Sequence, residues 1–164
     1  MKITSKTKYA DFEYAELFID DSERAKITQA AEQYFKPCSM LTLNEFIGLA
    51  EGNYDLLGDL SDPSVLQVYW LKKYEAFCKE VRDLCIRLQI EPTEEQKRAQ
   101  NGCLTMTPTE NMLIFTRSYF GLPSFFAAGE RTIGEYLTAR KDEYNKARYN
   151  RNWDAIQAAK FKKK

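Results

Sequence analysis

The sequence predicts an all-α fold, and three observations carry that prediction. Apolar residues recur at intervals of three and four over most of the 164 residues, which is the spacing of one helix face. The capping-box signature, Thr followed three residues later by Glu or Gln, occurs four times. Only 7 Gly and 5 Pro are present, which disfavours a turn-rich all-β fold. We therefore expect a single irregular bundle of about six helices that ends in a long C-terminal helix.

The six predicted helices follow from these start signals and from the apolar stripe behind each one. The pattern over residues 63–88 is the strongest, with one continuous apolar stripe, and predicts the central strut of the fold. Asp62 followed by Pro63 marks its expected start. The helix over 108–120 is dense in large apolar side chains and is expected in the middle of the core. The predicted helices span residues 22–35, 43–51, 63–88, 94–100, 108–120 and 132–161.

Two segments outside these helices are harder to assign. In residues 9–19, Phe12 and Tyr14 alternate with charged residues as in a strand, so a short N-terminal strand pair with residues 1–5 is one alternative. Residues 122–131 are expected to form a turn.

Two phrases of the sequence, residues 42–47 and 132–137, look alike. Each consists of a capping box followed by an aromatic residue that would face the core. Because that combination arises independently at helix starts, and because the flanking residues do not match, we infer no internal duplication.

Charge is balanced overall but unevenly distributed along the chain. Residues 1–60 hold 6 basic and 11 acidic residues, whereas residues 140–164 hold 9 basic and 3 acidic ones. An acidic front and a basic tail favour contact with an anionic partner or head-to-tail self-association, although a solvated tail explains the same pattern. The absence of a long apolar segment and of an apolar leader predicts a protein without a membrane association that stays in the cytoplasm.

The sequence offers little that could carry chemistry. It contains no histidine, no glycine-rich phosphate loop and no calcium loop, which removes most hydrolase and metal-site templates. The acidic residues Asp55, Asp59 and Asp62 lie close together, but loop solvation and helix capping explain them better than cation binding. Of the four cysteines, Cys38 is the least improbable nucleophile, yet no base is expected near it. We therefore expect no enzymatic activity, no cofactor and no metal site.

The C-terminal helix is the most informative part of the chain. We divide the chain into a helical core, residues 1–131, and a long basic helix, residues 132–164, within one domain. The apolar residues of this helix change sides along its length. A first group of apolar residues lies on one face of the helix. A second group, which consists of Tyr149, Trp153 and Ile156, lies on nearly the opposite face. The first group is Ile133, Tyr136, Leu137, Tyr144 and Ala147.

Three explanations fit this change of face, and the sequence leaves all three open. The second group can anchor a protein partner, as exposed Trp and Tyr residues often do. Alternatively, it folds back onto the core after a break at Asn150 or Asn152, both weak helix formers. A third explanation is nucleic-acid binding, in which basic side chains contact phosphates and aromatic side chains stack on bases. The basic residues concerned are Arg148, Arg151, Lys160, Lys162, Lys163 and Lys164.

Three segments carry a resemblance to a known class of proteins: residues 42–55, 119–125 and 132–146. Together they resemble the small helical accessory or assembly proteins of tailed bacteriophages and prophages, including the tail assembly chaperones. The resemblance implies a non-enzymatic protein that binds other phage proteins, in the bacterial host cytoplasm or in the virion. It assigns no role to an individual residue.

Overall fold

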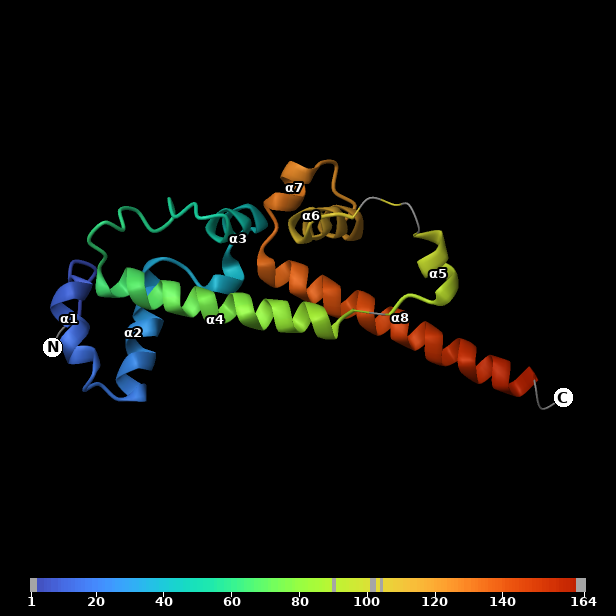
Figure 1. The fold of residues 1–164 in the computed structure, drawn as a ribbon, viewed down its shortest axis with the longest axis horizontal. Helices are drawn as coiled ribbons and strands as arrows, with labels where there is room; N and C mark the ends of the chain where they lie inside the picture. Colours follow the sequence, from blue (N-terminus) through green and yellow to red (C-terminus); the bar gives the residue numbers. More distant parts are fainter. Residues whose placement is uncertain (1–2, 90, 101–102, 104, 162–164) are drawn as a thin grey trace.

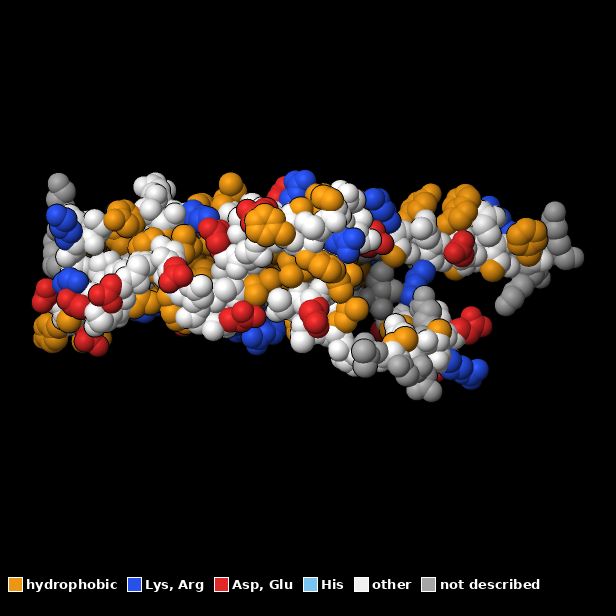
Figure 2. Space-filling view, turned by 90° about the horizontal axis from the view of Figure 1, so that it is seen from above, with side chains coloured by type: hydrophobic (Ala, Val, Ile, Leu, Met, Phe, Trp, Pro, Cys, Tyr) orange, Lys and Arg blue, Asp and Glu red, His pale blue; other side chains and the backbone are white. Residues whose placement is uncertain are grey.

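The computed structural model describes residues 3–89, 91–100, 103 and 105–161, and it is all-α over these residues. The molecule is elongated, with the N-terminal helices at one end and the end of α8 at the other (Figures 1 and 2). No β-sheet forms within the described residues, which confirms the predicted fold class. The helices are α1 (Tyr9–Glu16), α2 (Asp21–Tyr34), α3 (Leu43–Ala50), α4 (Val65–Arg87), α5 (Glu94–Ala99), α6 (Pro108–Tyr119), α7 (Phe125–Gly129) and α8 (Ile133–Phe161), with a 3-10 turn at Cys38–Met40.

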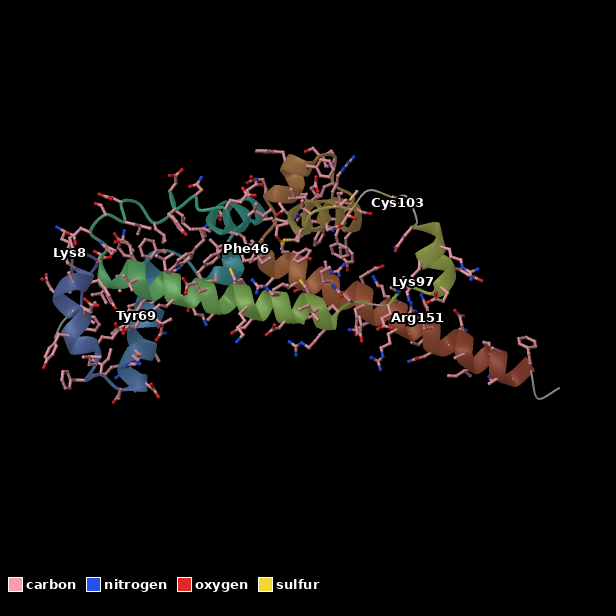
Figure 3. All side chains as sticks on the ribbon, in the orientation of Figure 1. Lys8, Phe46, Tyr69, Lys97, Cys103 and Arg151 are labelled. Atoms are coloured by element: carbon pink, nitrogen blue, oxygen red, sulfur yellow. The ribbon has the colours of Figure 1, made fainter. Side chains whose placement is uncertain are left out.

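Helix α4 is the central strut, as its apolar stripe predicts. It carries six buried residues, and α2 packs across its first half at a steep angle (Figure 1). Trp70 is fully buried and stacks on Tyr74, with ring centroids 5.7 Å apart and planes within 3°. The hydroxyl of Tyr74 donates a hydrogen bond to the carbonyl of Phe46 at 2.9 Å, which joins α4 to α3. Figure 3 labels Phe46 at this junction and Tyr69 nearer the start of α4.

Helices α1 and α4 start side by side. The residues just before them, Lys8 and Ser64, form an isolated antiparallel bridge. The first N–H of α1, from Tyr9, donates to the carbonyl of Pro63 at 2.9 Å, and the first N–H of α4, from Val65, donates to the carbonyl of Thr7 at 2.8 Å. Each helix thus supplies an acceptor for an N–H that has no partner inside the other helix.

Helices α3 and α8 repeat this arrangement at the middle of the molecule. Their capping residues, Thr42 and Thr132, form the second isolated antiparallel bridge. The N–H of Leu43 donates to the carbonyl of Arg131, and that of Ile133 donates to the carbonyl of Leu41, both at 2.8 Å. The two similar phrases of the sequence are therefore the two halves of one junction.

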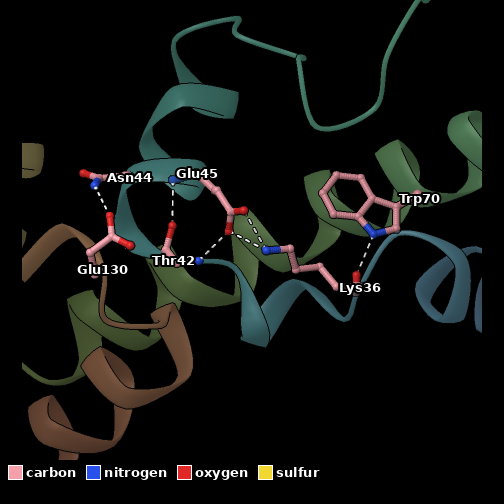
Figure 4. Close-up of polar contacts among 6 residues, drawn as sticks. All are labelled: Lys36, Thr42, Asn44, Glu45, Trp70 and Glu130. Carbon is pink, nitrogen blue, oxygen red and sulfur yellow. Dashed lines mark hydrogen bonds and ion pairs between the residues drawn. The ribbon is translucent and has the colours of Figure 1, made fainter.

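Side chains around the second junction complete its hydrogen bonding (Figure 4). Glu45 closes the capping box by accepting from the N–H of Thr42 at 2.8 Å, and it also pairs with the ammonium of Lys36 at 2.6 Å. The carbonyl of Lys36 accepts from the indole N–H of Trp70 at 2.8 Å. Burial raises the pKa of Glu45, but the bonds from Lys36 and Thr42 outweigh it and lower that pKa below its usual value.

Three sequence predictions about individual elements are wrong. The N-terminal strand pair does not form, because residues 9–16 are helix α1, with Phe12 buried against α4. Residues 125–129 form the short helix α7, capped by Ser124, within the expected turn. Helix α4 starts at Ser64 rather than at Asp62, because Ser64 and Gln67 form a capping box.

Helix α6 lies at the edge of the core rather than in its middle. Its fully buried residue is Thr116, while its large apolar side chains are half-buried in contacts with α7 and α8. Phe115 meets Tyr136 of α8 edge to face at 5.7 Å, and the guanidinium of Arg140 lies 4.8 Å above the Phe115 ring. The many apolar residues of α6 therefore pack in a second layer, which α6 forms with α7 and the start of α8.

The junction at the start of α8 leads to a stability prediction. A methyl group at Gly134 would lie 2.9 Å from the backbone oxygen of Ser39, which cannot move as a flexible side chain can. We expect Gly134→Ala to lower the free energy of unfolding by about 1–3 kcal/mol. The matched control is Gly48→Ala in α3, where the added methyl meets its nearest neighbour at 3.7 Å. That variant should gain about 0.5–1 kcal/mol from helix propensity. Equal denaturation midpoints for the two variants would contradict this account.

Candidate interaction surfaces

Helix α8 is continuous from Ile133 to Phe161, and its two halves lie in different environments. In the first half, Ile133, Tyr136 and Ala139 are buried in the core, and Ile133 and Tyr136 belong to the face that the sequence assigns to packing. In the second half, every residue from 148 to 161 except Gln157 is exposed. The fold-back alternative, with a break at residue 150 or 152, is therefore wrong, because the helix passes through both positions unbroken.

The second group of apolar residues forms an exposed stripe, which we call the distal stripe: Tyr149, Trp153 and Ile156. These side chains are 67%, 51% and 51% exposed. At about 100° per residue they lie within roughly 60° of one another around the helix, on nearly the opposite side from Ile133. Orange side chains stand out along this part of the molecule in Figure 2. Exposed Trp and Tyr side chains grouped in this way are typical of binding anchors.

The basic residues of the same segment are not gathered on one face. By helical spacing, Arg148 and Arg151 lie about 60° apart on one side of α8, whereas Lys160 lies about 120–180° away from them, on the side of the distal stripe. The guanidinium of Arg151 donates to the carbonyl of Glu91 at 2.9 Å, and that of Arg148 donates to the Tyr144 hydroxyl at 2.8 Å. Figure 3 shows Arg151 on α8, beside the segment between α4 and α5 that contains Glu91. The predicted residues Lys162, Lys163 and Lys164 lie outside the described residues.

A second apolar surface lies at the opposite end of the molecule, between α1 and α2. It is a groove of about 420 Å³, which we call the N-terminal groove. Buried side chains of all three neighbouring helices form its floor: Phe12 of α1, Ile27 of α2 and Leu66 of α4. The remaining lining residues are Ile3, Ala15, Ile19, Glu23, Lys26 and Ala30. Sequence reasoning missed this groove, because residues 9–19 alternate in polarity and gave no clear helical signal.

A polar cluster on α1 and α4 holds α1 in place beside the groove. The carboxylate of Glu16 accepts hydrogen bonds from the hydroxyls of Tyr9 and Tyr69 and pairs with the ammonium of Lys72 at 2.7 Å. Burial acts to raise the pKa of Glu16, but the hydrogen bonds from Lys72, Tyr9 and Tyr69 lower it to about 2. The carboxylate therefore stays charged at neutral pH, and α1 is fixed to the strut.

The two ends of the molecule carry opposite charge. Residues 9–34, which form α1 and α2, contain seven acidic and two basic residues, whereas residues 145–161 contain four basic and one acidic residue. One acidic side chain, Glu16, is neutralised by Lys72 as described above. The two ends of the chain are therefore complementary in net charge, while the lining of the groove itself carries one charge of each sign, Glu23 and Lys26.

The groups considered for chemistry are dispersed. Cys38 is buried, and burial raises the pKa of its thiol to about 11, so the thiolate is disfavoured at neutral pH. Asp62 pairs with Lys8 at 3.0 Å, and Asp59 accepts from the N–H of Ser61 at 2.8 Å. Over the described residues, no three His, Cys, Asp or Glu side chains come together as metal ligands.

Comparisons with protein-family models, with curated proteins and with solved structures give no match for this chain. The resemblance to phage assembly proteins therefore stays a prediction. Within the described residues, no helix combines the length and the apolar composition needed to cross a bilayer.

The Glu16 cluster leads to a pH prediction. Because the folded-state pKa of Glu16 is about 2 and its ordinary value is 4.5, its contribution is present above about pH 4.5 and is lost as the pH falls toward 2. Glu16→Gln should cost about 1–2 kcal/mol of unfolding free energy at neutral pH, and less as the pH falls through this window. Urea denaturation of both proteins over this range measures the difference. Glu13→Gln, on the exposed side of α1, is the control and should behave like the wild type. A pH-independent difference for Glu16→Gln would contradict the assignment.

Proposed function

We propose that this protein is a non-enzymatic interaction protein, and that the distal stripe of α8 binds a protein surface. The observation that carries the proposal is the exposure of Tyr149, Trp153 and Ile156 along one face of an unbroken helix. The stripe has the spacing with which an amphipathic helix places its anchors in an apolar groove. The resemblance to small phage assembly proteins supports the same function, that of an accessory structural protein or an assembly chaperone.

The arrangement of charges favours a protein partner over nucleic acid. A helix that follows a phosphate backbone needs its basic side chains on one side, where they can replace counterions together. Here Lys160 lies about 120–180° around α8 from Arg148 and Arg151. The two arginines, which share one side, bond to groups of this chain, the Tyr144 hydroxyl and the Glu91 carbonyl. The apolar anchors, in contrast, share one face. Nucleic-acid binding is therefore kept as an outcome of the test below.

The test removes two anchors that are exposed. In Tyr149→Ala/Trp153→Ala, the free energy of unfolding should change by less than about 0.5 kcal/mol, because no buried contact is lost. Binding to the partner should weaken at least ~10-fold, because aromatic anchors carry most of the energy of such interfaces. A photo-crosslinking residue at position 156, in cells of the natural host, reports binding as a covalent adduct with another polypeptide. Phe126→Ala removes an aromatic side chain of α7 that is even more exposed than the two anchors and is the control.

Each contrary outcome has a defined meaning. A crosslinker at Lys141, on the first half of α8, sets the background yield. Polypeptide adducts at 156 that do not exceed this background would overturn the proposal. An adduct removed by nuclease would replace it with nucleic-acid binding, and a loss of several kcal/mol of stability in the double variant would make Tyr149 and Trp153 structural residues.

A further inference from the structure

The two apolar surfaces of this chain are a ridge and a cleft, and the segments that carry them have opposite net charge. The distal stripe is a ridge of three side chains on a basic helix, and the N-terminal groove is an apolar cleft of about 420 Å³ between two acidic helices. That volume is within the range of clefts that hold a few large side chains, roughly 300–1,000 Å³. Two copies of the chain can therefore associate by placing the ridge of one copy in the cleft of the other.

We propose that the partner of the distal stripe is a second copy of this chain, whose N-terminal groove receives it. The inference rests on the proposed function and names the partner for the same site. In this contact Trp153 and its neighbours enter the groove above Phe12, Ile27 and Leu66. Lys146 and Lys160, the basic residues nearest the stripe around the helix, then lie against the acidic residues of α1 and α2. Opposite charges at the rim fix the orientation and speed the encounter.

The geometry excludes the same contact within one molecule. Helix α8 is unbroken and runs away from α1 and α2, so that its end and the groove lie at opposite ends of the elongated chain (Figure 1). The contact is also not self-complementary, because it joins two different surfaces. Head-to-tail contacts of this kind continue from copy to copy and build rings or filaments rather than closed two-fold dimers.

Charge also argues against the simplest alternative, in which the distal stripes of two copies pair with each other. Such a pair would bring together the basic residues that lie nearest the stripe in both copies, Lys146 and Lys160. Pairing with the acidic end of another copy replaces that repulsion with attraction. The exposed parts of the three anchors amount to roughly 300–400 Å², below the ~800 Å² per partner of stable complexes, so the association should be weak and concentration-dependent.

Mixing two complementary variants tests the proposal. Tyr149→Ala/Trp153→Ala lacks the ridge, and Ala30→Arg fills the groove and adds a charge of the wrong sign at its exposed edge. Each variant alone should remain a monomer in sedimentation over a wide concentration series, whereas the wild type should grow in mass. The equimolar mixture should form a 1:1 dimer that grows no further, since it contains one intact ridge and one intact groove. High salt should weaken association of the wild type at least several-fold, because opposite surface charges are screened.

Matched controls separate the outcomes. Ala10→Arg adds the same charge to α1 outside the groove and should associate like the wild type, and Ala30→Gln replaces Ala30→Arg if circular dichroism shows that the latter is unfolded. A wild type that stays monomeric, or a variant mixture that stays monomeric while the wild type associates, would overturn the inference. A monomeric wild type whose position 156 still crosslinks to a different polypeptide would overturn this inference and leave the proposed function standing.

Discussion

The fold depends on how four helices satisfy their first backbone N–H groups. A helix start leaves N–H groups without intrahelical partners, and leaving them buried and unpaired is costly. Here α1 pairs with α4 and α3 pairs with α8, each through two backbone hydrogen bonds of 2.8–2.9 Å. Leu41, Leu43 and Ile133 around the second pair are fully buried, so water cannot replace these bonds. The two paired starts thus fix where four of the helices begin and in which direction they leave.

The second pair determines where the distal stripe lies. The bridge between Thr132 and Thr42 holds the start of α8, and in its first turn Gly134 passes close to the backbone of Ser39. These two contacts set the direction in which α8 leaves the junction. Tyr136 then packs edge to face on Phe115, and the Tyr119 hydroxyl bonds to Asp142, which also pairs with Lys146. These contacts hold the first half of the helix. The second half continues along the same axis. Its residues are largely exposed, so hydrogen bonds within the helix, rather than packing on the core, keep it helical.

Much of this architecture could be predicted from the sequence, and the failures have physical causes. Capping boxes and Pro108 are local signals, and the predicted starts of α3, α6 and α8 agree with the structure to within a residue. Pairing between helix starts is a non-local contact, which no local pattern encodes, so the similarity of residues 42–47 and 132–137 did not reveal it. Helix α1 was missed because its stability comes from Phe12 against Tyr69 and from the Glu16 cluster, both contacts with α4. The groove was missed for the same reason.

Under the proposed function, the change of face along α8 separates the residues that stabilise the fold from those that bind a partner. Substitutions on the first half act on the core, because Ile133 and Tyr136 are buried. Substitutions on the distal stripe act on a surface that the isolated chain does not use for packing. An exposed Trp and Tyr would favour nonspecific aggregation if their surroundings were neutral. Under the proposed function, Lys146 and Lys160, the basic residues nearest the stripe, favour partner surfaces that are both apolar and acidic. The acidic end of the same chain meets both conditions, and the apolar cleft between α1 and α2 gives that end a shape into which the anchors can fit.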